Sequence, residues 1–298
     1  MSAVGRRLLR GVLALLARLG RGPLRRAQRV TGVLAGPMRL LMRRRARIVR
    51  RNLELCFPDL DADGRARLER AHFRNLAEAV GEIAVAWYHP GTLDAKFGDV
   101  VGLEHVQAAR ADGRGVLVLT GHVTCLELGA RLLGERVDAS AIYRPLSNPV
   151  LEDAQNRGRA RYAQRMIPRN NLRAMVRQLR AGGVLWYAPD QDLGPDRSRF
   201  APFFGVPAAT ATGMLELARL GRAHVVPMVP VKHPETGRVR VVVEAPMDPF
   251  PSDNPDGDLA RFNAFLERHV RAAPAAYWWL HRRFKTAPEG TPDRYATG

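Results

Sequence analysis

After residue 52 the apolar positions alternate repeatedly between two patterns, short unbroken runs and longer stretches with a helical spacing. Short apolar runs bounded by glycine, such as residues 115–121, predict buried strands. Longer stretches with apolar residues three or four apart predict helices. Strands are expected at 115–121, 139–143, 184–188, 224–231 and 239–244, and helices at 61–88, 125–134, 149–164, 170–181, 209–221 and 256–272. This alternation predicts an α/β fold with a mostly parallel central sheet flanked by helices.

The first 51 residues have a different pattern. Fifteen arginines precede the first acidic residue, Glu54, and carry most of the net charge of +18. On a helix over residues 4–21, Arg7, Arg10 and Arg18 share one side and a stripe of leucine and valine lies opposite. Such a helix typically lies in the interface of an anionic membrane. The alternative is a basic helix packed on the protein's own body.

This amino-terminal region lacks the sequence patterns of a membrane-spanning helix and of a nucleic-acid-binding segment. Its uncharged runs, 11–17 and 30–38, are shorter than a bilayer-spanning helix requires. It has no interleaved aromatic residues for base stacking, which argues against a nucleic-acid partner. We therefore divide the chain into a basic, amphipathic membrane-association region at 1–51 and a catalytic domain at 52–298.

The cysteine content restricts the chemistry further. The chain has two cysteines, Cys56 and Cys125, too few and too far apart for a disulfide scaffold. No Cys or His cluster has the spacing of a zinc site, so no metal is expected. Cys125 can be considered as an acyl-enzyme nucleophile, but a cysteine between Thr124 and Leu126 is more often a core residue.

Three loops follow predicted strands, where active sites of parallel sheets collect. The first places His122 five residues before Glu127, and a carboxylate bonded to one imidazole nitrogen would leave the other as a general base. The spacing alone is weak, since His89 and Asp94 repeat it, but His89 lies in a His-Pro-Gly break. His122 instead follows a buried strand closely, which favours it as the catalytic residue.

The second and third loops offer groups for binding. Arg144 follows the strand at 139–143 and could hold a phosphate or stabilise negative charge, unless it is simply a surface residue. Asp190 and Asp192 follow the strand at 184–188 and are a possible cation site. Phe203, Phe204 and Gly205 then form an aromatic loop, which would line an acyl tunnel or fill the core. The aromatic and basic residues at 277–285 fit either a lipid headgroup interface or an aromatic core.

Taken together and in order, these segments resemble the late acyltransferases of lipid A biosynthesis, the lauroyl-transferring branch in particular. The resemblance runs from about residue 40 to 293 and is strongest at Gly121–Gly129, Tyr143–Pro145, Leu185–Asp190, Phe203–Thr210 and Tyr277–Lys285. It implies that His122 and Glu127 match the family's His-x4-acidic signature. It also implies that Arg144 and Asp190 contact the acceptor and that the phenylalanine loop belongs to the acyl tunnel.

The same resemblance implies the reaction and its location. His122 would deprotonate a hydroxyacyl chain of the Kdo-bearing tetraacyl lipid A precursor, and the alkoxide would attack the thioester of a fatty acyl chain on acyl carrier protein. No cofactor is implied, because acyl-acyl carrier protein is a substrate. The expected location is the cytoplasmic face of the inner membrane. Two alternatives remain at this stage: a thioesterase or lipid hydrolase with the same His–Glu pair, and a non-enzymatic basic membrane-binding protein.

Overall fold

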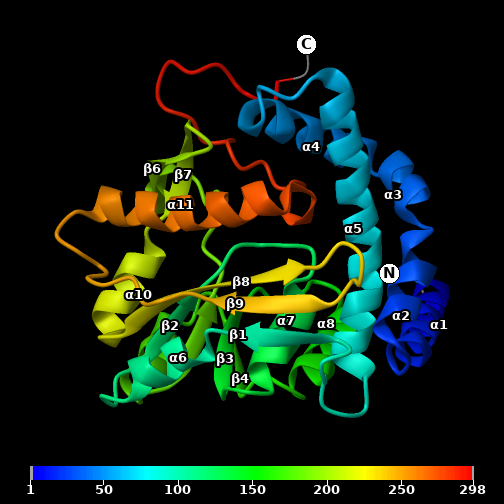
Figure 1. Ribbon diagram of the computed structural model, residues 1–298, viewed down its shortest axis with the longest axis horizontal. Coiled ribbons are helices and arrows are strands. Elements are labelled where there is room, and N and C mark those ends of the chain that lie inside the picture. The colour runs from blue at the N-terminus through cyan, green and yellow to red at the C-terminus, as the bar shows by residue number, and fades with distance from the viewer. Residues whose placement is uncertain (1–2, 297–298) are drawn as a thin grey trace.

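A seven-stranded sheet forms the centre of the computed structural model, which describes residues 3–296 (Figure 1). The strands are β1 (Gly98–Val101), β2 (Val116–Leu119), β3 (Ala139–Tyr143), β4 (Arg165–Pro168), β5 (Val184–Tyr187), β8 (His224–Lys232) and β9 (Val239–Val243). Their order is β1-β9-β8-β2-β5-β3-β4. Within this sheet β8 and β9 are antiparallel and the other neighbours are parallel. The predicted α/β fold with a mostly parallel sheet is confirmed.

Helices connect the strands and cover the sheet. They are α5 (Ala62–Tyr88), α6 (Leu103–Arg110), α7 (Leu126–Gly134), α8 (Pro149–Arg159), α9 (Leu172–Arg180), α10 (Gly213–Gly221) and α11 (Pro255–Ala272), with short 3-10 turns η1 (Pro195–Arg197) and η2 (Pro274–Ala276). The chain moves outward from β2 to β3 and β4 and then returns to β5 and β8. Since parallel crossovers are right-handed, this reversal places α7 and α8 on one face and α9 and α10 on the other.

The burial of each strand explains whether the sequence analysis could predict it. All four residues of β2 are buried, as a central strand covered on both faces requires, and its sequence is continuously apolar. The strands β1 and β4, which the sequence analysis missed, lie at the two edges of the sheet and include polar residues such as Asp99 and Arg165. A four-residue edge strand of mixed polarity has no clear pattern of its own.

The sequence analysis predicted a phenylalanine-rich loop followed by a helix from residue 209, and for residues 198–211 this prediction is wrong. They form an antiparallel hairpin of β6 (Ser198–Phe203) and β7 (Val206–Ala211), and α10 begins only at Gly213. The turn consists of Phe204 and Gly205, whose φ values of 53° and 72° suit a two-residue hairpin turn. Pro202 and Pro207 face each other across the pair, and proline weakens the sequence signal for a strand.

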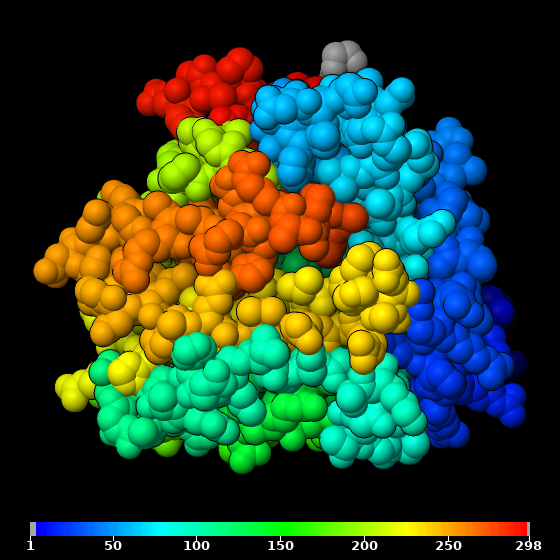
Figure 2. Space-filling model, viewed as in Figure 1, coloured from blue at the N-terminus to red at the C-terminus, as the bar shows by residue number. Residues whose placement is uncertain are grey.

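The basic amino-terminal region folds into four helices, α1 (Ala3–Gly20), α2 (Leu24–Gly32), α3 (Ala35–Leu41) and α4 (Arg43–Cys56). Figure 2 shows α1–α3 in darker blue along one side of α5 and α4 in lighter blue at the end where α5 begins. Asp61 caps the first turn of α5. The predicted apolar side of α1 divides in two. Leu13, Leu16 and Leu19 are half-buried, as in the alternative of a helix packed on the protein's own body.

A second apolar stripe of α1 faces outward. Val4, Leu8, Val12 and Leu15 are each at least half exposed, and they recur every three or four residues along one side of the helix. Among residues 3–296, no helix combines the length and the apolar character needed to cross a bilayer. The membrane-association role of residues 1–51 stays a prediction, as does the division at residue 51. Across that division α4 is continuous, and Leu24 and Val49 belong to the same core as β2.

Candidate active site

The sheet brings three of the predicted site residues to one edge. Adjacent strands β2, β5 and β3 are parallel, so their carboxyl ends lie side by side. His122 follows β2, Asp190 follows β5 and Arg144 follows β3. The expectation that these loops meet at the carboxyl edge is therefore confirmed.

His122 is held by the carboxylate of Asp190. Its Nδ1–H donates to Asp190 Oδ1 at 2.5 Å, and its backbone N–H donates to Asp190 Oδ2 at 2.9 Å. Asp190 is 1% exposed, whereas the His122 side chain is 30% exposed. Because the carboxylate fixes the proton on Nδ1, the Nε2 atom is left unprotonated and able to act as a base.

Asp190 and His122 each shift the pKa of the other toward its charged form. Burial raises the pKa of Asp190, but the charge and hydrogen bonds of His122 outweigh that effect and lower it to about 2. Burial lowers the pKa of His122, and the Asp190 carboxylate more than offsets it, so this pKa lies above its ordinary value. A base with a raised pKa accepts a proton more readily than a free imidazole does.

Backbone contacts fix the loop that carries His122. The His122 carbonyl accepts a hydrogen bond from Trp278 N at 2.9 Å. Gly121 leaves the space that Asp190 occupies, since a Cβ there would lie 2.7 Å from Leu266 and 3.3 Å from Asp190 Oδ2. A larger residue at position 121 would crowd the Leu266 side chain first and then the Asp190 carboxylate.

A cavity of about 270 Å³ opens beside His122. It lies between the inner side of α7 and the strands β3 and β5, and β3 lines it over its whole length. Most of its walls are apolar, and they include Leu126, Ala130, Ala139, Ala141, Ile142, Met166, Trp186 and Ala188. Arg144 also lines it, is exposed, and finds no ion-pair or hydrogen-bond partner for its side chain in the described part of the chain. The site thus combines a base, an apolar cavity and an available cation.

Glu127 does not contact His122 as predicted. It lies on the first turn of α7 and lines the same cavity, but its carboxylate is occupied by other groups. Arg159 donates to both oxygens at 2.8 and 2.6 Å, Trp87 Nε1 donates at 2.7 Å and Tyr162 OH at 2.5 Å. The predicted His122–Glu127 pair is therefore wrong, and Asp190, predicted to bind substrate, is the imidazole's partner. Arg159 also lines the cavity, and sequence reasoning missed it because no local pattern marks it.

We expect Glu127→Gln to act mainly through stability. The pair is largely buried, with Glu127 12% and Arg159 21% exposed, and removing the carboxylate leaves the guanidinium without its counter-charge. The free energy of unfolding should fall by about 3 kcal/mol, measured by urea denaturation. Asp153→Asn, which removes a surface pair with Arg157, is the control and should change stability by less than about 1 kcal/mol. Unchanged stability with lost turnover in Glu127→Gln would instead assign Glu127 to the chemistry.

The aromatic loop contributes to the core rather than to this cavity. Phe203 and Phe204 are 0% and 7% exposed. Their rings pack on each other and on Phe57, Tyr277, Trp279 and Phe284. With Gly205 in the hairpin turn, none of the three lines the cavity beside His122, and the burial of both phenylalanines fits the alternative in which they fill the core.

The remaining candidate residues are buried or hydrogen-bonded in ways that give them a structural role. Cys125 is fully buried and burial raises the pKa of its thiol to about 12, which fits the core reading and not a nucleophile. Asp192 accepts from Thr286 and Gly194, so it does not form a cation site with Asp190. Within residues 3–296, no three His, Cys, Asp or Glu side chains are grouped as a metal site would need. The 277–285 segment belongs to the aromatic core, since Trp279 and Phe284 are fully buried; Arg282 and Lys285 lie exposed beside it, whereas Arg283 is itself buried.

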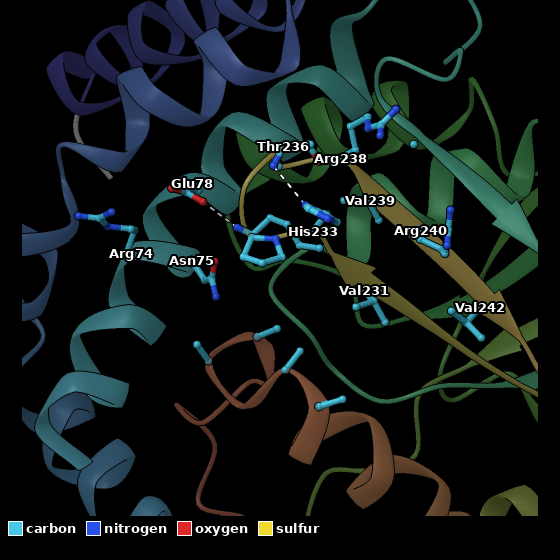
Figure 3. A pocket seen from close by; sticks show the side chains of 18 of the residues that line it. Arg74, Asn75, Glu78, Val231, His233, Thr236, Arg238, Val239, Arg240 and Val242 are labelled. Atoms are coloured by element: carbon cyan, nitrogen blue, oxygen red, sulfur yellow. Dashed lines mark hydrogen bonds and ion pairs between the residues drawn. The ribbon is translucent and has the colours of Figure 1, made fainter. Parts of the chain in front are cut away.

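A larger cavity of about 1000 Å³ lies elsewhere, between α5, the β8–β9 hairpin and the end of α11 (Figure 3). Several of its charged side chains neutralise one another. Lys232 contacts Glu78 and Glu82, and Arg240 contacts Asp99. None of the predicted site residues lines it. His122 and the cavity beside it therefore remain the candidate active site.

Comparison with known proteins gives the family. A family model described as bacterial lipid A biosynthesis acyltransferase matches residues 5–286. The chain belongs to this family. The acyltransferase is 40% identical to the lipid A biosynthesis lauroyltransferase of Escherichia coli K12, over 85% of this chain and 83% of that one. It is 39% identical to the palmitoleoyltransferase of the same organism, over 89% and 85% of the two chains, and 30% identical to its myristoyltransferase, over 94% and 83%.

The family establishes the type of protein. The acyltransferase is an O-acyltransferase of lipid A biosynthesis, so the non-enzymatic alternative is excluded and the hydrolase alternative has no support from the relatives. Among solved structures, the 1-acyl-sn-glycerophosphate acyltransferase PlsC of Thermotoga maritima matches 78% of this acyltransferase and 97% of its own chain, at 14% identity and a TM-score of 0.37. A likeness at that level supports no conclusion about function.

Proposed function

We propose that this acyltransferase moves a fatty acyl chain, lauroyl or one of similar length, from acyl carrier protein to a hydroxyacyl chain of the Kdo-bearing tetraacyl lipid A precursor. The observation that carries the proposal is the His122–Asp190 pair at the side of an apolar cavity. The relatives named lauroyltransferase and palmitoleoyltransferase support the acyl class. No cofactor takes part in the proposed reaction.

His122 is the general base in this reaction. Its Nε2 takes the proton of the acceptor hydroxyl, and the oxygen attacks the thioester carbonyl to form a C–O bond. The C–S bond then breaks, and the carrier thiolate leaves with the proton from His122. Asp190 stays ionised throughout and stabilises the imidazolium, as the carboxylate of a serine-protease triad does. Arg144 is placed to bind a phosphate of the acceptor or the developing oxyanion.

The apolar cavity takes the acyl chain of the donor. Its lining includes all five residues of β3, from Ala139 to Tyr143, which corresponds to a depth of about 13 Å at the usual rise per residue. Gly134, Ala139 and Ala163 lie at the end of this path, because Ala139 begins β3 while Arg144 follows its last residue. Small residues at that end leave room for the last carbons of the chain.

The amino-terminal helices attach the enzyme to the cytoplasmic face of the inner membrane in this proposal. The outward stripe of Val4, Leu8, Val12 and Leu15 gives α1 an unpartnered apolar side. The surrounding arginines are attracted to anionic lipids. A basic surface also suits acyl carrier protein, which is acidic.

Acyl transfer by the purified protein tests the proposal. Acyl carrier protein loaded with chains of different lengths is mixed with the Kdo-bearing tetraacyl precursor, and lipid products are resolved by mass spectrometry. A pentaacyl product supports the proposal, and the preferred chain defines donor specificity. Free fatty acid released equally with and without the acceptor would contradict it and indicate a hydrolase.

We expect Ala163→Leu to shorten the preferred acyl chain. The extra carbons occupy space at the far end of the cavity, so the optimum should move to donors shorter by roughly two to four carbons. Donor competition assays measure this shift. Ala108→Leu adds the same volume on the exposed surface of α6 and should leave the optimum unchanged. An unchanged optimum in Ala163→Leu would show that the chain lies elsewhere.

A further inference from the structure

A strongly cationic hollow lies apart from the active site, where α4 meets the end of the chain. Figure 1 shows α4 and the described carboxyl-terminal segment at the same end of the molecule. The hollow has a volume of about 640 Å³. Six arginines line it, against two carboxylates, Glu54 and Asp293; they are Arg44, Arg47, Arg50, Arg51, Arg282 and Arg294.

Half of these arginines have a structural partner. Arg51 donates to the Arg294 carbonyl and to Glu54, Arg50 contacts Glu69, and Arg294 donates to the Pro207 carbonyl. These contacts tie the last described residues to α4 and to the β6–β7 hairpin. Tyr295 completes the wall through hydrogen bonds with Asn52 and Phe284. The hollow is therefore built from fixed elements rather than from loose side chains.

The other three arginines are available to a ligand. Arg44, Arg47 and Arg282 are exposed, and no described residue supplies their side chains with a hydrogen-bond acceptor or counter-ion. Arg282 only stacks over the Tyr295 ring, at 5.6 Å. Arg44 and Arg47 also lie in the first turns of α4, where the helix dipole disfavours cations. Like charges gathered in this way favour binding of an anion with several acceptor oxygens.

We propose that this hollow binds the phosphate group of an anionic membrane lipid. The residues just before α4 indicate a lipid rather than a soluble phosphate. Leu40 and Leu41 are 59% and 86% exposed, so exposed apolar side chains lie four and three residues before Arg44 in the chain, and a bilayer lipid offers both chains and a headgroup. The site deepens the proposed membrane attachment, and its test does not depend on the acyl transfer at His122.

Hydrogen bonds also connect the residues around the hollow to the loop that carries His122. Arg282 belongs to the same segment as Trp278, whose N–H bonds the His122 carbonyl. Asn52, on α4, donates to the carbonyls of Trp279 and His281 within that segment. A lipid phosphate bound by Arg282 would hold the segment, and with it the His122 loop, in a fixed position relative to the bilayer.

The test measures sedimentation of the full-length protein with phosphatidylcholine vesicles, with and without phosphatidylglycerol. The informative variant is the double Arg44→Lys, Arg47→Lys, because it keeps the charge but loses the planar fork that grips phosphate. We expect its affinity for the phosphatidylglycerol vesicles to fall by roughly tenfold or more. Both arginines are exposed and unpartnered, so the fold should not change, and circular dichroism checks this.

Two comparisons decide the interpretation. Arg7→Lys, Arg10→Lys is the matched control on α1 and should bind as wild type does. If both Lys variants bind like wild type, only diffuse charge attracts the protein and the proposed site is wrong. If inorganic phosphate alone raises the melting temperature of wild type as much as the vesicles do, the site takes a soluble anion and the lipid assignment is wrong. Acyl transfer by wild type in detergent is assayed separately, so either proposal can fail without the other.

Discussion

His122→Ala should lose acyl transfer by roughly a hundred- to ten-thousandfold, the usual contribution of a general base. The substitution removes the only imidazole that lines the described cavity, and with it the group that accepts the hydroxyl proton. Turnover with saturating donor and acceptor gives kcat directly. Binding of the donor should change little, because most of the cavity wall is apolar and remains in place.

His89→Ala is the matched control for this variant. His89 and Asp94 repeat the His-x4-acidic spacing, yet the His89 side chain contacts only the Gly91 carbonyl and the Phe97 ring. Its removal should change turnover by no more than about twofold. Wild-type turnover in His122→Ala would place the base elsewhere.

Asp190→Asn should lower turnover by about a hundredfold or more and also change its pH dependence. The amide cannot hold the imidazolium that forms during the reaction. Loss of the carboxylate also removes the influence that keeps the His122 pKa above its ordinary value, while burial still lowers it. The pKa of His122 should therefore fall.

The sign of the pH effect follows from the role of the base. Activity needs neutral His122, so kcat/KM falls as the pH drops through the His122 pKa. In wild type this fall should occur above pH 6.5, the ordinary value, and in Asp190→Asn it should move to lower pH. Asp192→Asn is the control, because Asp192 holds Thr286 and not His122. An acid limb that stays in place in Asp190→Asn would show that another group titrates there.

The buried strands and the loops after them could be predicted from the sequence. Strands such as β2 and β5 are covered on both faces, so their sequences are unbroken apolar runs that need no long-range information. The loops that follow them could therefore be chosen as candidates, and the structure brings these loops together at the carboxyl edge of the sheet. Edge strands and the β6–β7 hairpin were missed because their residues face solvent or include proline.

The partner of His122 could not be predicted from local spacing. Asp190 is 68 residues away along the chain, and only the sheet order shows that β5 lies beside β2. Glu127 was the nearer carboxylate, but the helix that carries it directs it toward Arg159 instead. The phenylalanines were ambiguous for a similar reason, since a tunnel and a core require the same apolar residues.

The contacts of Glu127 have an evolutionary consequence. One carboxylate serves Trp87 from α5, Arg159 from α8 and Tyr162 from the turn that follows, so a change at any of these positions alters the surroundings of the others. Selection then acts on the four residues as a group, and substitutions among them should arise together rather than singly. The acidic residue of the His-x4-acidic signature would be retained here because it joins the helices around the cavity, while the proposed proton transfer uses His122.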